Sequence, residues 1–152
     1  MRRWRVTFDG GRWSGEVEGR RVVWPGEVRG GGEGVVAVAG WPAGQGKRMV
    51  RAIECSSAVK DGAWGVVVCP EVRLLLAAAG EEGVRALRDE LTELAKAGRA
   101  ASPEAWLAVG VSRWAVSAWG GASAWSGLDW AAVERAGRES GMDAVVELAD
   151  GG

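Results

Sequence analysis

The 152-residue chain has no histidine, no tyrosine and no asparagine, and its one phenylalanine is Phe8. Without histidine it has neither a Ser-His-Asp nor a Cys-His catalytic group, and no imidazole to bind a metal. Carboxylates, lysines and thiols remain, but no pair of acids stands in a context typical of acid–base catalysis. Asp89 and Glu90, for example, fit a solvated helix face. We therefore expect that the protein is not an enzyme.

Cysteines and long apolar runs are also scarce. Cys55 and Cys69 are the two cysteines, fewer than a structural zinc site requires. The N-terminus does not read as a signal peptide, and no apolar run reaches the roughly 18 residues of a membrane span. We expect a cytoplasmic protein with no metal, no cofactor and no membrane contact, whose two thiols are reduced and packed as small apolar groups.

Charge is unevenly distributed along the chain. The first 61 residues contain eleven cations and seven acids, whereas the segment from residue 84 onward contains seven cations and ten acids. Alternation near the N-terminus places Arg3 and Arg5 on one strand face and Trp4, Val6 and Phe8 on the other. This pattern predicts a strand with its apolar face inside and its basic face in solvent.

Residues 1 to 70 favour β-structure, because apolar alternation and turn signals recur. The expected strands cover residues 4–8, 13–17, 22–24, 35–39, 49–55 and 64–69. The Gly-rich segment Gly40 to Arg48 departs from the spacing of a phosphate-binding P-loop. We expect a hairpin loop there.

From Glu71 onward the apolar spacing becomes helical, with Val84, Leu87, Leu91 and Leu94 on one face. Cap signals predict further helices over 103–109, 112–119 and 130–141, and the last apolar run predicts a terminal strand over 144–148. The expected fold class is therefore α+β, with an antiparallel β-rich domain over residues 1–75. A helical domain with the terminal strand follows over 76–152.

The stretch from Gly110 to Trp119, GVSRWAVSAW, predicts a tight turn followed by an amphipathic helix. Gly110 permits the turn, Ser112 is a favourable N-cap, and Val111 and Val116 form a buried side. In these residues the chain resembles the Cro/repressor-type helix-turn-helix family, over residues 84–141 in all.

That resemblance implies a small sequence-specific DNA-binding regulator, of a phage or another mobile element. By the same likeness Arg113, Trp114 and Ser117 would face the major groove of duplex DNA, and Ser102 and Ser112 would contact phosphates. Proteins of this family commonly act as symmetric homodimers. The β-rich part would then dimerise or hold a protein partner.

The same residues allow other interpretations. In one, the helical part is a plain subdomain in which Trp106 and Trp114 are packing residues and Gly110 is an ordinary helix C-cap. In another, the helix-turn-helix contacts protein. A function of a different class is a non-enzymatic structural or interaction protein, such as a virion component or a host-protein binder. Its Trp- and Gly-rich surfaces would serve assembly, because Trp and Arg are enriched at interface anchors.

Overall fold

The computed structural model describes residues 1–29, 34–41, 44 and 47–150, and its strands form one eight-stranded sheet in the order β2-β1-β8-β7-β6-β5-β4-β3. The strands are β1 (Arg2–Asp9), β2 (Arg12–Ser14), β3 (Glu16–Val17), β4 (Arg20–Val23), β5 (Val36–Ala39), β6 (Gly65–Val68), β7 (Trp106–Ser112) and β8 (Ala144–Asp150). The helices are η1 (Pro25–Glu27), α1 (Arg48–Lys60), α2 (Val72–Leu76), α3 (Gly80–Ala101), α4 (Arg113–Gly120) and α5 (Trp130–Glu139).

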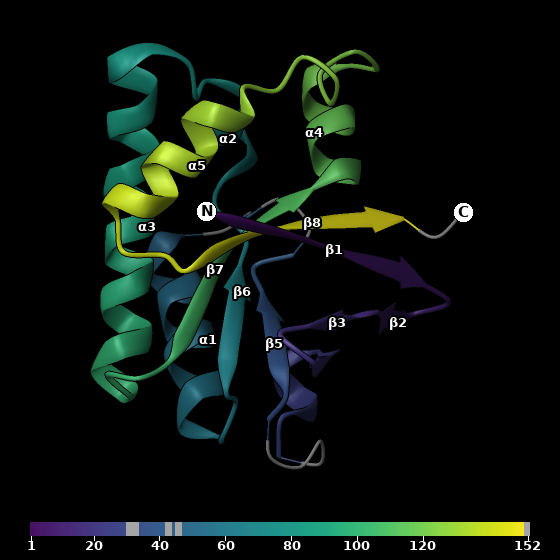
Figure 1. The fold of residues 1–152 in the computed structure, drawn as a ribbon, viewed down its shortest axis with the longest axis vertical. Coiled ribbons are helices and arrows are strands. Elements are labelled where there is room, and N and C mark those ends of the chain that lie inside the picture. The colour runs from purple at the N-terminus through teal and green to yellow at the C-terminus, as the bar shows by residue number, and fades with distance from the viewer. Residues whose placement is uncertain (30–33, 42–43, 45–46, 151–152) are drawn as a thin grey trace.

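The sheet curls into a nearly closed barrel (Figure 1). Strands β4 to β8 and β1 pair in parallel, whereas β1–β2 and β3–β4 are antiparallel. The two edge strands of the sheet, β2 and β3, are joined by a single residue, Gly15, which has φ 102°. The chain itself therefore links the two edges, and a positive φ of this size favours glycine.

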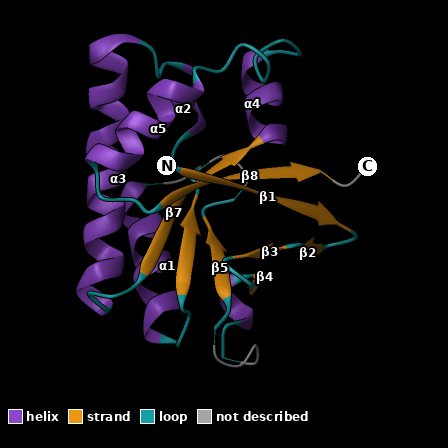
Figure 2. Cartoon of the chain, viewed as in Figure 1, coloured by secondary structure: helices purple, strands orange, loops and turns teal. Residues whose placement is uncertain are grey.

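Helices cover only part of the barrel. Helix α1 connects β5 to β6, α2 and α3 connect β6 to β7, and α4 and α5 connect β7 to β8. Figure 2 shows α1, α3 and α5 together on one side and α4 apart from them near the end of β7, with none of these helices beside β2 and β3. Strands β5 and β6 are buried at every residue, as expected for parallel strands with a core on both faces.

Two apolar cores result, one inside the barrel and one under the helices. The inner core is formed mainly by strand residues, among them Val6, Val22, Val36, Val67, Ala108 and Val146. The outer core joins the alternate strand residues to the helices, with Leu87, Leu91 and Leu94 of α3 fully buried in it. In β1, Val6 is buried and Arg3 and Arg5 are exposed, which confirms the predicted apolar and basic faces.

The expected α+β class, with an antiparallel N-terminal part, is wrong, because the strands alternate with helices and mostly run parallel. Residues 49–55 were expected as a strand and belong to α1, where Met49, Val50 and Ile53 are exposed apolar side chains. Residues 103–109 were expected as a helix, but the run from Trp106 onward is β7. The apolar residues of β7 are buried on both faces of the strand, so the sequence shows no alternation of polar and apolar residues that would indicate a strand.

Other expected elements are confirmed: the strands near residues 4–8, 22–24, 35–39, 64–69 and 144–148, and the helices near 84–95, 112–119 and 130–141.

Of the expected hairpin loop between Gly40 and Arg48, residues 42, 43, 45 and 46 lie outside the described residues. It leads into a helix, α1, so the hairpin expectation is wrong. The domain division at residue 75 stays a prediction, although strands from both sides of it share one sheet. No helix in the described ranges has the length and apolarity to cross a membrane.

Gly110 provides a test of the barrel. It lies inside β7 and not in a turn, and a Cβ there would come within 2.9 Å of Val67 Cγ1 and 3.0 Å of Cys69 Sγ in the inner core. Because overpacking a core costs about 1–3 kcal/mol, we expect Gly110→Ala to lower the free energy of unfolding by that amount. Gly26→Ala, whose Cβ meets nothing within 4 Å, is the control. Equal urea midpoints for the two variants would contradict the fold.

Candidate functional site at the carboxyl end of the barrel

The carboxyl ends of the parallel strands meet at one end of the barrel, which we call the mouth. Trp24 follows β4, Gly40 and Trp41 follow β5, Cys69 follows β6, and Ser112 ends β7. In parallel α/β barrels this end carries the ligand site, because the loops and helix N-termini that follow the strands converge there. We therefore expect a ligand site at the mouth.

An aromatic plug, consisting of Phe8, Trp13, Trp24 and Trp41, fills the centre of the mouth. Every pair of these four rings is in contact, with centroids 4.8 to 5.7 Å apart. Trp24 Nε1 donates to the carbonyl of Gly11 at 3.2 Å, whereas Trp13 Nε1 is buried without a hydrogen-bond partner. The plug packs large aromatic rings together at the ends of β1, β4 and β5.

A pocket of about 340 Å³ lies beside the plug, where β2 and β4 face each other, and we call it the seam pocket. Its lining residues are Arg12, Trp13, Arg21, Val22, Val23 and Glu27. Glu27 Oε1 accepts a hydrogen bond from the backbone N–H of Trp24 at 3.0 Å, which fixes the carboxylate relative to the plug. The pocket thus combines two guanidinium groups, one positioned carboxylate and an aromatic wall.

A buried ion pair lies at another part of the rim, between α1 and α3. Arg51 Nη2 donates to Glu90 Oε1 at 2.8 Å, and Arg48 Nε donates to the same oxygen at 3.3 Å. The other carboxylate oxygen of Glu90 accepts from the backbone N–H of Glu71, just after β6, at 2.7 Å. With Ser112, Arg51 and Glu90 make up the buried polar side chains of the described chain.

The pKa of Glu90 reflects two opposed effects. Burial raises the pKa of this carboxyl, but hydrogen bonds from the Arg51 side chain and the Glu71 backbone, with the charge of Arg51, outweigh burial. The pKa of Glu90 is therefore held below its ordinary value, and the carboxylate stays ionised at neutral pH. Its expected place on a solvated helix face is wrong, because its side chain is 2% exposed.

Glu90 could have been found in the sequence. It lies three residues after Leu87 and four before Leu94, and so falls within the apolar stripe of α3. A carboxylate within an apolar stripe predicts a buried charge with a partner. Arg51 had no comparable signal, because its segment was taken as a strand.

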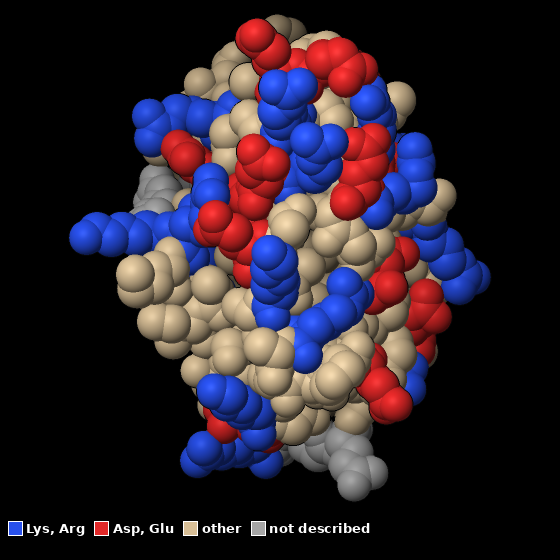
Figure 3. All heavy atoms as spheres, turned by 90° about the vertical axis from the view of Figure 1, so that its left-hand side faces the viewer, with Lys and Arg blue, Asp and Glu red and all other residues tan. Residues whose placement is uncertain are grey.

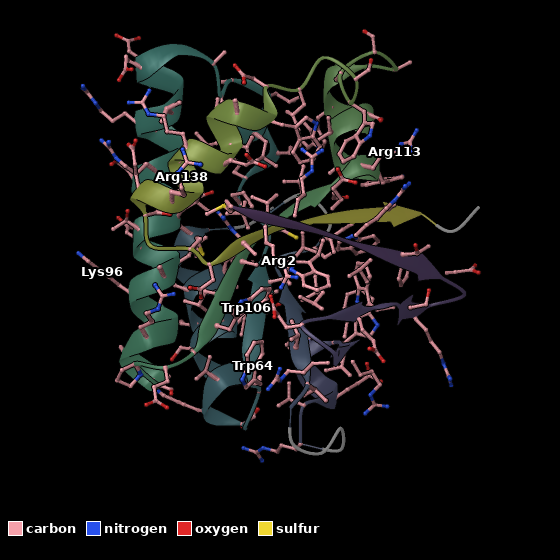
Figure 4. The ribbon with its side chains drawn as sticks, in the orientation of Figure 1. Arg2, Trp64, Lys96, Trp106, Arg113 and Arg138 are labelled. Atoms are coloured by element: carbon pink, nitrogen blue, oxygen red, sulfur yellow. The ribbon has the colours of Figure 1, made fainter. Side chains whose placement is uncertain are left out.

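The opposite end of the barrel is closed by stacking. Trp64 and Trp106 stack with centroids 5.5 Å apart, and the Arg20 guanidinium lies 3.6 Å from the Trp64 centroid. Figure 4 shows Trp64 and Trp106 together at this end, with Arg113 on α4 at the other. Trp106 is thus a packing residue of the barrel.

The residues expected to bind DNA lie near α4 and at the end of α3. Ser112 caps α4, since its Oγ accepts from Ala115 N at 3.2 Å, and this confirms the predicted N-cap. Arg113 and Ser117 belong to α4, as does Trp114, which is 48% exposed, and Ser102 follows α3 as its C-cap. Because β7 stands where the second helix of a helix-turn-helix was expected, these residues do not form that motif.

Both cysteines are buried, as expected, in different cores. Cys55 packs in the outer core and Cys69 in the inner core. Burial raises the pKa of Cys55 to about 12 and also raises that of Cys69 strongly. Both thiols are therefore protonated at neutral pH and poorly nucleophilic.

The helical face in Figure 3 mixes acidic and basic side chains. Arginines there pair with acids, as in Arg135–Glu81 at 2.8 Å and Arg88–Glu139 at 3.0 Å. DNA binding depends on cations that are free to neutralise phosphates. These ion pairs do not provide such a surface.

The Arg51–Glu90 pair has a pH signature. Because the folded pKa of Glu90 is depressed, its contribution to stability is present above the unfolded pKa, near 4.3, and is lost as pH falls through the folded value. We expect Glu90→Gln to cost about 3–5 kcal/mol at pH 7, because it leaves Arg51 buried and unpaired, and to cost less as pH falls below 4. Glu93→Gln, at a side chain 60% exposed, should change little. Urea unfolding of both variants and the wild type at several pH values measures these differences. An equal loss of unfolding free energy in Glu90→Gln at every pH would contradict the ion pair as its cause.

The sequence matches no protein-family model, and no curated protein is similar to it. The structure, however, is similar to solved aldolases. One is "QR15, an Aldolase", with a TM-score of 0.61 and 20% identity, where the match covers 84% of this chain and 52% of that one. Another is the deoxyribose phosphate aldolase of Aeropyrum pernix, with a TM-score of 0.57, 19% identity, and 84% and 49% coverage.

A putative deoxyribose-phosphate aldolase from Toxoplasma gondii ME49 matches with a TM-score of 0.56 and 22% identity, over 82% of this chain and 46% of that chain. The chain spans about half the length of these structures. At such identity the likeness shows the fold, which resembles a TIM barrel.

These findings correct the sequence-based function. The helix-turn-helix resemblance and the DNA-binding regulator that it implied are wrong, because the structure and its solved neighbours are α/β barrels. The alternative of a non-enzymatic assembly protein, and the expectation of no enzyme, are overturned by the same comparison, since the neighbours are aldolases. The chain shares the barrel fold of these neighbours.

Proposed function

We propose that this protein is an enzyme-type barrel that binds a small molecule in the seam pocket. The observation that carries the proposal is the lining of this pocket: it lies where β2 meets β4, and Trp13 of the aromatic plug forms one of its walls. The other pockets described, near Glu81 and near Ile53, lie among the helices. The predicted cytoplasmic location stays part of this proposal.

The lining of the seam pocket indicates the kind of ligand. Arg12 and Arg21 come from two facing strands, and guanidinium groups bind carboxylate or phosphate groups well. Glu27 is the carboxylate of the pocket, and its bond to Trp24 N positions it to accept or donate a proton. A small anionic molecule with an exchangeable proton fits this set.

Two of the solved neighbours are named as deoxyribose-phosphate aldolases. A lysine amine can form a Schiff base with a carbonyl compound, so the positions of the lysines bear on the reaction. All three lysines of this chain lie outside the strands. Lys47 precedes α1, Lys60 ends α1, and Lys96 belongs to α3. The proposal therefore assigns proton transfer by Glu27, and not Schiff-base chemistry, to this protein.

Ligand binding tests the proposal through tryptophan fluorescence, because Trp13 lines the pocket and the rings of Trp24 and Trp41 contact Trp13. We would titrate deoxyribose phosphate, deoxyribose, glycerate and lactate at constant ionic strength. We expect a saturable change for an anionic compound, and about tenfold weaker binding or worse for Arg12→Ala, which corresponds to 1.4 kcal/mol. Arg5→Ala, at an exposed position of β1, is the matched control. No saturation, or equal binding by Arg12→Ala, would contradict the proposal.

Covalent trapping tests the chemistry separately. We expect no mass increase when the protein is incubated with deoxyribose phosphate and borohydride, because no lysine lies on a barrel strand. Mass spectrometry of the intact chain gives the result. A borohydride-dependent adduct on Lys47, Lys60 or Lys96 would show that the excluded reaction occurs.

A further inference from the structure

Helix α1 exposes apolar side chains to solvent. Met49, Val50 and Ile53 are 69%, 56% and 58% exposed, and their spacing of three and four residues places them on one face of the helix. The opposite face, which includes Cys55 and Val59, is buried in the outer core. A surface helix normally has a polar outer face, and a contiguous exposed apolar patch commonly marks an interaction site.

This patch borders a hollow between α1 and α3. The two helices pack against each other (Figure 1), and a pocket of about 290 Å³ lies at their junction. The half-buried small side chains of Ala52, Ser56 and Ala97 line it, with exposed Met49 and Ile53 beside them. We call this pocket together with Val50 the α1 groove. A hollow of this kind suits an apolar side chain of a partner better than the flat surface of a bilayer does.

Positive charge surrounds the α1 groove. The chain has three lysines, and all of them belong to these two helices or their caps. Lys47 is the N-cap of α1, Lys60 ends α1 and lines the groove, and Lys96 belongs to α3 and points outward in Figure 4. In the described part of the chain none of the three pairs with an acid.

The acids near the groove are already engaged. Glu93 pairs with Arg48 at 3.2 Å, Asp61 pairs with Arg29 at 2.8 Å, and Glu54 accepts a hydrogen bond from a backbone N–H at 3.1 Å. The groove therefore combines an apolar centre with unpaired positive charge. Two copies of it placed face to face would bring like charges together, whereas an acidic partner is complementary to it.

We propose that the α1 groove binds an acidic amphipathic helix of a protein partner. Apolar side chains of that helix, at three- and four-residue spacing, pack on Met49 and Ile53, and one of them enters the pocket. Its carboxylates pair with Lys47 and Lys60 at the two ends of α1. Because α1 has 13 residues, these ends are roughly 20 Å apart, so the partner helix carries acids about four turns apart. The proposal does not depend on the function of the seam pocket.

The experiment titrates the full-length protein with a fluorescently labelled helical peptide. The peptide has about 18 residues, with leucines at three- and four-residue spacing and glutamates in its first and last turns. The same peptide with lysine in place of glutamate is the charge control. We expect the anisotropy to saturate with the acidic peptide, and the basic peptide to bind at least about tenfold more weakly.

Methyl resonances locate the contact. The chain contains three methionines, of which Met49 is exposed beside the groove, Met142 is buried, and Met1 is the first residue. In protein labelled with carbon-13 at the methionine methyl groups, we expect the acidic peptide to move the Met49 signal. The signals of Met1 and Met142 should stay in place.

Four variants test the two parts of the groove. Ile53→Ser removes an apolar side chain and Lys60→Glu reverses a charge, and each should weaken binding of the acidic peptide at least about tenfold. Both side chains are exposed, so the urea midpoints should stay close to that of the wild type. The matched controls are Trp114→Ser, at an exposed apolar residue of α4, and Arg138→Glu, at an exposed cation of α5 (Figure 4). Both controls should bind as the wild type does.

An anisotropy that does not saturate, an unmoved Met49 signal, or equal binding by Ile53→Ser and the wild type would overturn the proposal. A dimer in sedimentation that Ile53→Ser dissociates would also overturn it, because the occupant would then be a second copy. Binding to phosphatidylglycerol vesicles that Ile53→Ser abolishes, without binding of the peptide, would assign this face to a membrane instead. None of these outcomes changes the test of the seam pocket by Arg12→Ala.

Discussion

Closure of the sheet at Gly15 is the constraint on which the rest of this structure depends. A single residue joins β2 to β3, so the edges of the sheet stay together and the strands must enclose a fixed volume. In a barrel of eight strands that volume is just filled by side chains. Valine and alanine fill its middle, and the large aromatic rings fill both ends, where the strands diverge.

The distribution of function follows from this filling. Because aromatic rings occupy the centre of the mouth, polar groups are displaced to its rim, at the seam beside Glu27 and at the start of α1 beside Arg51. The helices cover only the side from β5 to β8, so the second of these sites is buried while the first remains accessible. The polar groups of the barrel are thus divided between two places.

Much of the secondary structure was predictable from local patterns, as in α3 with its leucine stripe and in Ser112 at the cap of α4. The parallel topology was missed, although Val36–Ala39 and Gly65–Val68 are continuous apolar runs of the kind found in parallel strands, because the helix that connects them, α1, was taken as a strand over residues 49–55. The apolar residues Met49 and Ile53 suggested a strand there, but both side chains are exposed on α1. Of the site, Glu90 was detectable from its place among leucines. Arg12 and Arg51 were not, because only the tertiary fold brings β2 next to β4 and packs α1 against α3.

The pairing of β1 with β8 has a consequence for biosynthesis. The first strand of the chain runs parallel to the last, from Arg2 beside Ala144 to Phe8 beside Asp150. While the protein is being made, β1 has its hairpin partner β2 but lacks its other neighbour until β8 has left the ribosome. Until then the nascent barrel keeps an edge with unpaired backbone hydrogen-bonding groups, and it closes in a long-range step.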